Sequence, residues 1–257
     1  MTPDNEHTTQ PDFSEKKSRP RTVLIMGGSG VIGGAICQRF AEAQWKVGIH
    51  YYRNETSARK LCQEIQKQGK ESSLFQADVR NQHQTTHLLK QFLHRWERLD
   101  ALIWAVGHAI STLTVRISPE EWDELIQTNL TSLFFCLQSI GPLLQAQKSG
   151  SFLVISSLAS MKGATGQAAY AASKAGVLGL VRSVAQEWGT DNIRVNAVFP
   201  GWHRSALTGE AFPPPEACHD HLLGRTPNLQ ETADHIYHLA TANDISGQIF
   251  NLDSRIW

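Results

Sequence analysis

The sequence lacks an excess of charge of either sign. Lysine and arginine together number 24, as do aspartate and glutamate, so the formal net charge at pH 7 is zero. No global field therefore favours binding to nucleic acid or to an anionic membrane surface. Long apolar runs are also missing, and none approaches the roughly 20 residues that a membrane-spanning helix needs. We expect neither nucleic acid nor a membrane as a partner.

Cysteine is scarce, and its spacing indicates no cross-linked or metal-bound framework. The four cysteines, Cys37, Cys62, Cys136 and Cys218, are scattered without paired spacing, so neither disulfides nor a zinc site are indicated. Free thiols fit a reducing compartment, and we expect a cytoplasmic protein without a bound metal. Residues 1–21 are polar and lack an apolar core, which excludes a secretory signal and predicts a flexible tail before a domain over residues 22–257.

Short apolar runs alternate with longer helical patterns from residue 22 onward. Strands separated by helices imply parallel pairing with right-handed crossovers. The sequence therefore predicts an α/β fold: a single doubly wound (Rossmann) domain with a seven-stranded parallel sheet and helices on both faces. The expected strands are 22–26, 46–51, 72–77, 99–104, 151–155, 193–198 and 247–252. The expected helices are 31–44, 55–68, 82–96, 167–188 and 229–241, with a further long helix that opens at Ser118-Pro119.

A glycine-rich loop stands between the first expected strand and the first expected helix. Residues 27–33 read GGSGVIG and contain the pattern G-x-G-x-x-G as Gly28, Gly30 and Gly33. Glycines let the backbone turn tightly and approach a pyrophosphate, whose charge lies at the helix N-terminus. An ordinary strand-to-helix turn would also use glycines, but the strand–loop–helix context favours a dinucleotide site.

The end of the second strand bears on which dinucleotide is bound. An acidic residue there binds the ribose 2′-hydroxyl of NAD, whereas an arginine accommodates the 2′-phosphate of NADP. The chain reads HYYRN over residues 50–54, with no acid before Glu55. Arg53 therefore favours NADP(H) over NAD(H), and the alternative is that Arg53 is a solvated loop residue.

Tyr170 and Lys174 lie four residues apart on one expected helix and therefore share a face. Because a nearby ammonium favours the phenolate, we expect Lys174 to lower the pKa of Tyr170 from its ordinary value near 10. A phenol tuned in this way can exchange a proton with a carbonyl or alcohol oxygen. Such a pair is more often a solvated surface couple, so its meaning depends on the rest of the chain.

Taken together, these motifs resemble those of the short-chain dehydrogenase/reductase family, in the single-domain branch that includes the 3-oxoacyl carrier-protein reductases. The resemblance covers nearly all of the chain after residue 20. Further shared segments are Ala77-Asp78-Val79, Asn129-Leu130, Ile155-Ser156-Ser157, Ile193-Arg194-Val195-Asn196, Pro200-Gly201, Leu223-Gly224-Arg225 and Ser246-Gly247-Gln248.

The resemblance implies a catalytic set. Tyr170 would be the general acid for carbonyl reduction, and Lys174 would lower its pKa and hold the nicotinamide ribose. Ser157 would hydrogen-bond the substrate oxygen, and Asn129 would anchor a water-linked proton relay to Lys174. Paired hydroxyl donors suit this reaction, because negative charge develops on the oxygen as hydride arrives. Outside this constellation, Ser157 would read as a strand-end cap and Asn129 as a polar helix residue.

The resemblance also implies a cofactor surface and a substrate surface. Asp78 would contact the adenine, and Pro200-Gly201 with the hydroxyl of Ser205 would cap the nicotinamide. Residues 202–227 should form a lid, in which Trp202 contacts substrate or only packs the lid. The expected cofactor residues are Gly27, Ser29, Gly30, Ile32, Gly33, Arg53, Asp78, Val79, Ala105, Gly107, Tyr170, Lys174, Pro200, Gly201 and Ser205. The expected substrate residues are Met161, Trp202 and His203.

The chain departs from the family pattern at three places. Val31 stands where this branch has a glycine. Trp104-Ala105-Val106-Gly107 replaces Asn-Asn-Ala-Gly, so the asparagine hydrogen bonds to the central strand are lost. Asp253-Ser254-Arg255 replaces a terminal Asp-Gly-Gly. None of these departures removes a catalytic group.

We therefore expect an NADPH-dependent carbonyl reductase that transfers hydride to a 3-oxoacyl-type or other small ketone. An alcohol dehydrogenase of the same family working oxidatively and a non-catalytic NADP-binding interaction protein are the alternatives. A carrier protein stays open as a partner: Lys148 would suit a basic docking rim, but Gln186 and Asp191 stand where such reductases tend to have arginines. The resemblance suggests a homodimer or homotetramer through helices 119–144 and 167–188.

Overall fold

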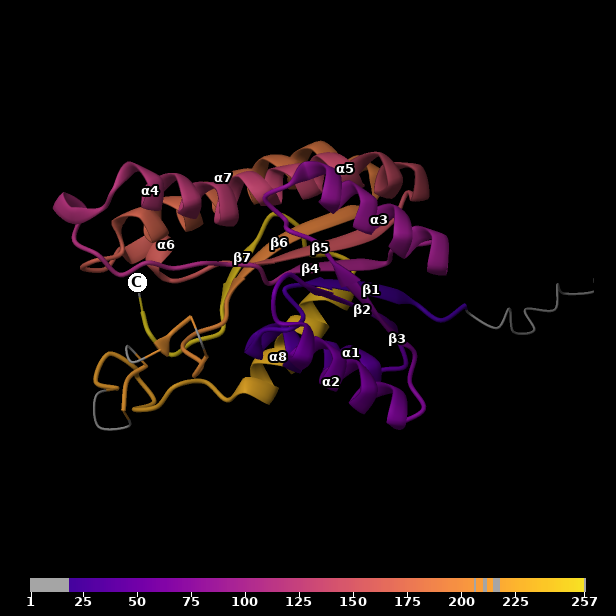
Figure 1. Ribbon diagram of the computed structural model, residues 1–257, viewed down its shortest axis with the longest axis horizontal. Coiled ribbons are helices and arrows are strands. Elements are labelled where there is room, and N and C mark those ends of the chain that lie inside the picture. The colour runs from indigo at the N-terminus through magenta and orange to yellow at the C-terminus, as the bar shows by residue number, and fades with distance from the viewer. Residues whose placement is uncertain (1–18, 206, 210–211, 215–217, 257) are drawn as a thin grey trace, which may run out of the picture.

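A seven-stranded parallel sheet organises the chain, in the order β3-β2-β1-β4-β5-β6-β7 (Figure 1). The computed structural model describes residues 19–205, 207–209, 212–214 and 218–256. The strands are β1 (Thr22–Met26), β2 (Lys46–Tyr51), β3 (Ser72–Gln76), β4 (Ala101–Trp104), β5 (Gly150–Ile155), β6 (Ile193–Phe199) and β7 (Ile249–Asn251). The predicted fold class is confirmed. Most of the expected tail, residues 1–18, lies outside the described residues.

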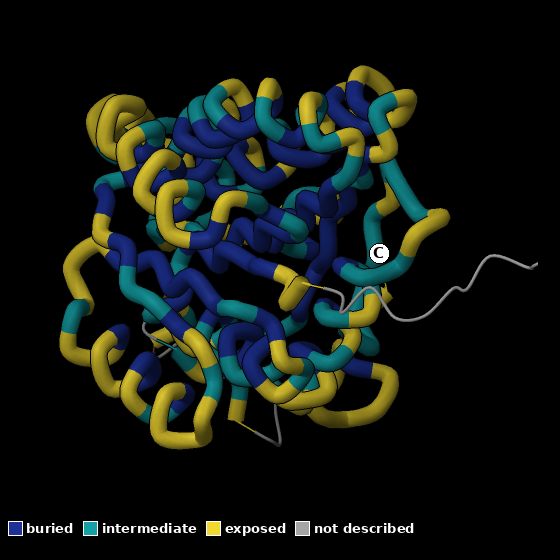
Figure 2. The backbone as a smooth tube through the Cα atoms, turned by 90° about the vertical axis from the view of Figure 1, so that its right-hand side faces the viewer, coloured by how far each residue is buried: buried dark blue, intermediate teal, exposed yellow. Residues whose placement is uncertain are grey.

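Helices cover both faces of the sheet (Figure 1). One face carries α1 (Val31–Glu42), α2 (Glu55–Lys67) and α8 (Leu229–Thr241), and the other carries α3 (Gln82–Trp96), α5 (Ser132–Gln147) and α7 (Ala168–Trp188). All five residues of β1 are buried, as expected for a central parallel strand covered on both sides. Exposed positions follow the outer surfaces of the helices (Figure 2). Within the described part of the chain, no helix is long and apolar enough to cross a bilayer.

The expected long helix after Ser118 is interrupted. Its first part, α4 (Pro119–Ile126), begins with a reciprocal cap: Ser118 Oγ accepts from Glu121 N–H at 3.1 Å, and the Glu121 carboxylate accepts from Ser118 N–H at 2.9 Å. A π-helical turn, η2 (Gln127–Thr131), then joins α4 to α5. Such turns add a residue to the helix and are frequent at functional sites. The hydrophobic pattern did not indicate it.

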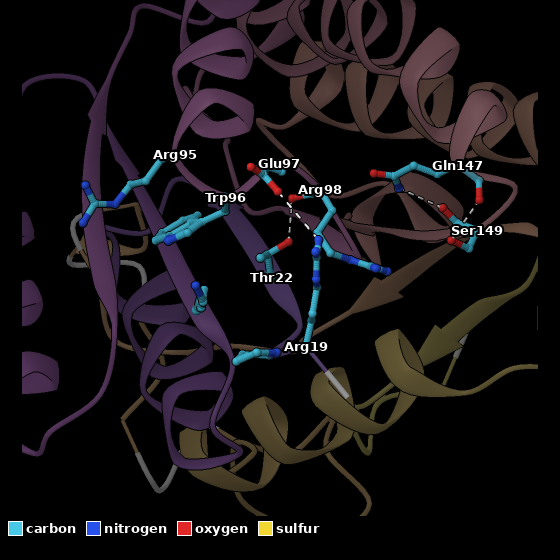
Figure 3. Close-up of a pocket in the computed structure, with 10 residues that line it drawn as sticks. Arg19, Thr22, Arg95, Trp96, Glu97, Arg98, Gln147 and Ser149 are labelled. Atoms are coloured by element: carbon cyan, nitrogen blue, oxygen red, sulfur yellow. Dashed lines mark hydrogen bonds and ion pairs between the residues drawn. The ribbon is translucent and has the colours of Figure 1, made fainter. Parts of the chain in front are cut away.

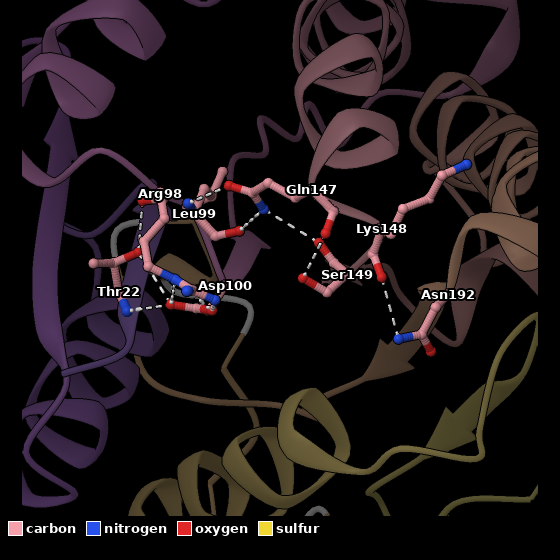
Figure 4. A network of polar contacts seen from close by, with 8 residues as sticks. All are labelled: Thr22, Arg98, Leu99, Asp100, Gln147, Lys148, Ser149 and Asn192. Carbon is pink, nitrogen blue, oxygen red and sulfur yellow. Dashed lines mark hydrogen bonds and ion pairs between the residues drawn. The ribbon is translucent and has the colours of Figure 1, made fainter. Parts of the chain in front are cut away.

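Polar contacts fasten the amino ends of β1, β4 and β5 (Figure 4). The N–H of Thr22 donates to Asp100 Oδ2 at 2.8 Å, and Arg98 pairs with the same carboxylate. From the end of α5, the Gln147 amide accepts from Leu99 N–H at 3.1 Å and donates to Leu99 O at 2.9 Å. This network links the strands at the end of the sheet opposite their carboxyl ends.

A cavity of about 500 Å³ opens beside this network, at the amino ends of the strands (Figure 3). Three of the cations that line it already have acidic partners. Arg98 pairs with Asp100, Arg19 lies 3.7 Å from Glu97, and Lys46 lies 3.2 Å from Glu71. Open α/β sheets bind their ligands at the carboxyl ends of the strands. The candidate site is therefore expected at the carboxyl ends of the strands.

Candidate active site

The carboxyl ends of β4 and β5 meet the first turns of α7 and the η2 turn. The short helix α6 (Ala159–Lys162), which the sequence did not indicate, follows β5 here. Figure 1 shows α4, α6 and the segment after β6 at this same end of the molecule. Among the described residues, no cluster of three His, Cys, Asp or Glu side chains could hold a metal ion.

Tyr170 is the third residue of α7, in the helix's first turn, and is 8% exposed. Burial raises the pKa of its phenol above the ordinary value of 10, and a hydrogen bond with the Ser157 hydroxyl offsets part of that rise. The expectation that Lys174 lowers this pKa is wrong for the cofactor-free chain. The Lys174 ammonium lies 6.0 Å from the centre of the Tyr170 ring, and burial of the phenol sets the direction of its pKa shift.

Lys174 is itself a buried cation, 3% exposed. Its Nζ donates to the carbonyl oxygen of Ile155, at the end of β5, at 3.1 Å. Burial lowers the pKa of Lys174 from 10.5 to about 8. The lysine is therefore still charged at neutral pH, and two of its three N–H donors are left for other partners.

Asn129 is fully buried in the η2 turn, and its side-chain amide makes three hydrogen bonds. Its Nδ2 donates to His108 O at 2.8 Å and to Ser173 Oγ at 2.9 Å, and its Oδ1 accepts from His108 N–H at 2.8 Å. A Cβ atom on Gly107 would lie 3.3 Å from Lys174 Nζ and 3.9 Å from Asn129 Oδ1. The absence of a side chain at Gly107 thus keeps a gap between the amide and the ammonium.

The backbone of the glycine loop after β1 packs closely against its neighbours. Gly27 has φ +84°, and a Cβ there would lie 2.7 Å from Ala105 O at the end of β4. A Cβ on Gly33 would lie 2.2 Å from Gly27 O, so the loop and the first turn of α1 touch through backbone alone. Helix α1 has no side-chain cap and no acid in its first turn. These features fit a bound pyrophosphate.

The other expected cofactor residues of the loop differ in exposure, and their contacts with the cofactor stay predictions. Ser29 is partly exposed and Gly30 is exposed, whereas Ile32 packs against the core beneath α1.

Two arginines gather at the ends of β2 and β3. The guanidinium of Arg53 lies 4.9 Å from the centre of the Tyr52 ring, and that of Arg80 lies 5.6 Å from it. Arg80 also donates to Tyr52 Oη at 3.2 Å and pairs with Asp78 Oδ2 at 2.7 Å. This hydrogen-bonded pair holds the pKa of Asp78 below its ordinary value. Asp78, the expected adenine contact, is thus already engaged, while the neighbouring Val79 is buried.

The segment after β6 contains the expected nicotinamide and substrate contacts. Pro200 is buried and its carbonyl accepts from His203 Nε2 at 3.0 Å, so His203, 5% exposed, packs into the base of the lid. Trp202 lies beneath the Arg255 guanidinium, 5.6 Å from ring centre to carbon. Met161, on α6, is half-exposed. The contacts expected for Trp202, His203 and Met161 stay predictions.

The rest of the expected lid is only partly described. The Ser205 hydroxyl lies 3.4 Å from that of Thr208, and Gly201 has φ +81° with Pro227 packed against it. Residues 206, 210–211 and 215–217 of the lid lie outside the described residues.

Two residues of the site were missed from the sequence. Arg80 belongs to no motif, and only the folded chain brings its guanidinium against Asp78 and Tyr52. His50 was overlooked because it stands within an apolar strand, yet it is 3% exposed and contacts Gly27 through Nδ1 at 2.9 Å. A lone polar residue in a buried strand was the available signal.

Comparison with known proteins gives consistent matches. The family model described as short chain dehydrogenase matches residues 21–215. The chain is 36% identical over 236 residues to the 3-oxoacyl-[acyl-carrier-protein] reductase of Synechocystis sp., covering 91% of this chain and 95% of that protein. It is 34% identical over 188 residues to the 3-oxoacyl-[acyl-carrier-protein] reductase FabG of Staphylococcus epidermidis, covering 73% and 77%.

Solved structures agree with these relatives. The crystal structure of gox2181 superposes with a TM-score of 0.86 at 29% identity, covering 91% of this chain and 95% of that one. The structure of ElxO with NADP bound gives a TM-score of 0.84 at 25% identity, covering 92% and 98%. The matches over most of the chain, joined to the glycine loop and the buried Tyr170–Lys174 pair, lead to one conclusion: the chain belongs to the short-chain dehydrogenase/reductase family of oxidoreductases, which act on carbonyl and hydroxyl groups.

Proposed function

We propose that this chain is an NADPH-dependent reductase of 3-oxoacyl-type or other small ketones, with Tyr170 as the general acid. The observation that carries the proposal is the convergence of one phenol, one hydroxyl and one buried ammonium at the carboxyl ends of the strands. Tyr170 and Ser157 share a hydrogen bond, and the Lys174 ammonium lies on the same helix face.

The cofactor would be held along the ends of β1, β2, β4 and β6. The backbone of the glycine loop would take the pyrophosphate, and Lys174 with its two remaining N–H donors would take ribose hydroxyls. Ala105, Pro200 and Gly201 would border the nicotinamide. When bound, NADPH supplies the hydride that reduces the carbonyl carbon.

The chain's own groups manage charge and protons at the carbonyl oxygen. Tyr170 and Ser157 donate hydrogen bonds to that oxygen, which stabilises the negative charge that develops on it. Tyr170 then gives up its proton. A phenol with a raised pKa stays protonated at neutral pH, so it is ready to act as an acid. Lys174, beside the gap at Gly107 and Asn129, is placed to return a proton to the phenolate.

NADP(H) is preferred over NAD(H) in this proposal. The support is the pair of guanidinium groups within 6 Å of the Tyr52 ring, at 4.9 Å for Arg53 and 5.6 Å for Arg80. Arg80 is neutralised by Asp78, whereas the guanidinium of Arg53 is exposed and lies over the Tyr52 ring. Arg53 is therefore the cation we assign to the 2′-phosphate.

The charges on the surface around Lys148 favour a small thioester as substrate over an acyl group carried by a docked carrier protein. Lys148, the cation that would suit a docking rim, pairs with Asp191, and Asn192 donates to its carbonyl oxygen at 3.3 Å. Gln186 is exposed and uncharged. A carrier's acidic surface would find little net positive charge here.

We also propose a cytoplasmic homodimer or homotetramer. The outer face of α7 exposes Ala172, Ala175 and Gly179, small residues that allow close helix approach, and Phe134 on α5 is 46% exposed. Light scattering of the purified chain would measure the state, and a monomer at micromolar concentration would contradict the assembly.

The test of the function is consumption of NADPH, followed at 340 nm, with a short-chain 3-oxoacyl thioester and a panel of small ketones. We expect turnover by the wild-type chain with the thioester. A chain that binds NADPH but reduces nothing in the panel would contradict the proposal and favour a non-catalytic binding protein.

A further inference from the structure

We infer that His50 is a positioning residue for the dinucleotide: its ring sets the spacing between the glycine loop and the adenosine side of the site. The inference rests on the proposed function, because it assumes that the loop binds a nicotinamide dinucleotide. His50 lies near the end of β2, the strand between β1 and β3 in the sheet.

The ring bridges the two neighbouring strand ends. Its Nδ1 accepts from the N–H of Gly27, the first residue after β1, at 2.9 Å. Its Nε2 lies 3.0 Å from the carbonyl oxygen of Ala77, the residue after β3 that directly precedes Asp78. One rigid side chain therefore connects the start of the phosphate loop to the start of the segment that holds Asp78.

The partners determine the form of the ring. An N–H group can only donate and a carbonyl oxygen can only accept, so Nδ1 carries the lone pair and Nε2 carries the proton. An imidazolium would place a second N–H against that of Gly27. Burial lowers the pKa of His50 to about 4, so the neutral ring persists at physiological pH.

The His50 bridge holds a stretch of backbone whose conformation is already tightly constrained. Gly27 has φ +84° and touches Ala105 on one side and Gly33 on the other. Gly27 O also accepts from Gly30 N–H at 3.1 Å, which fixes the turn into α1. Releasing the Gly27 N–H would leave a partly buried donor without its partner and allow the loop to shift toward the pyrophosphate position.

The variants are His50→Leu, which keeps a similar volume without polar atoms, and His50→Asn, which restores one acceptor and one donor. The control is Ile65→Ala, which removes volume from the core between α2 and the sheet, on the face opposite His50, where Ile65 is 1% exposed. NADPH affinity is measured by calorimetry, thermal stability by scanning calorimetry, and KM and kcat at saturating thioester.

His50→Leu should raise the Kd and KM for NADPH by about tenfold, as for loss of a hydrogen bond that leaves a backbone donor unpaired, with kcat at saturating NADPH nearly unchanged. His50→Asn should recover part of that affinity. Ile65→Ala should lower Tm and leave Kd nearly unchanged. Wild-type Kd in His50→Leu, or an equal affinity loss in Ile65→Ala, would overturn the positioning role.

A second measurement uses the wild-type protein and does not depend on whether a variant folds. Nitrogen-15 NMR of the wild-type ring should show the neutral form protonated at Nε2, with both ring resonances shifting when NADPH is added. The opposite tautomer, or resonances that ignore NADPH while calorimetry shows it bound, would overturn the inference. A wild-type chain that binds neither NADPH nor NADH would instead contradict the proposed function, and with it the premise of this inference.

Discussion

Replacing Lys174 with methionine should stabilise the cofactor-free chain while removing its activity. At pH 7 this lysine is charged in both states, because its pKa is about 8 when folded and 10.5 when unfolded. The difference of about 2.5 pH units corresponds to a burial penalty of about 3 kcal/mol at ~1.4 kcal/mol per unit. The hydrogen bond from Nζ to Ile155 O, at 3.1 Å, returns about 1 kcal/mol of this.

Lys174→Met should therefore raise the free energy of unfolding by about 2 kcal/mol at pH 7, which is a Tm increase of roughly 4–8 °C for a chain of this size. The sign depends on pH. A lysine whose folded pKa is lowered carries its full penalty below pH 8 and loses it as pH rises toward 10.5. The advantage of the variant should shrink to about zero by pH 10.

Scanning calorimetry of both proteins at pH 7 and pH 10 measures this difference. Lys162→Met, at an exposed position on α6, is the matched control and should show no such pH-dependent advantage. The reasoning is refuted if Lys174→Met is less stable than the wild type by the same amount at both pH values.

Three further predictions follow from the same structure. Because the pKa of His50 is lowered from 6.5 to about 4, the folded chain should lose about 3 kcal/mol of stability as pH falls from 6.5 through 4, while Asp78, the charged group facing the ring, stays ionised over most of this range. Denaturant unfolding of the wild type and of His50→Asn over this pH range measures the loss. An equal pH dependence of the unfolding free energy in both proteins would contradict it. Gly33→Ala places a Cβ 2.2 Å from Gly27 O, so NADPH affinity measured by calorimetry should fall by more than tenfold, and wild-type affinity would contradict the close approach. Arg53→Asp should raise the Kd for NADPH much more than that for NADH, and equal changes would remove this arginine from the phosphate site.

The regular elements were largely predictable because their signals are local. The bounds of β1, β2, α3 and α8 agree with the expected ranges, since buried strands and amphipathic helices are encoded by nearby residues. The η2 turn was not predictable, because a π turn changes the register of Asn129 without changing the hydrophobic pattern.

The sequence predicted which residues form the candidate site, but it did not predict the direction of their pKa shifts. Motif spacing indicated Tyr170 and Lys174, and the structure places both in the interior at 8% and 3% exposure. That burial reverses the expected direction of the tyrosine pKa, which spacing alone cannot reveal because desolvation depends on the surrounding fold. The bridge made by His50 depends on three strands far apart in sequence, so no local pattern encodes it.

Transfer of deuterium tests the central claim most directly. The wild-type chain is incubated with NADPH that carries deuterium at both hydrogen positions of the nicotinamide C4 and with a 3-oxoacyl thioester, and the product is analysed by mass spectrometry. The wild type should yield a 3-hydroxyacyl product one mass unit heavier, labelled at the carbinol carbon, and Tyr170→Phe should bind NADPH but form almost none of it. Unlabelled product from the wild type, or labelled product from Tyr170→Phe at the wild-type rate, would contradict the account.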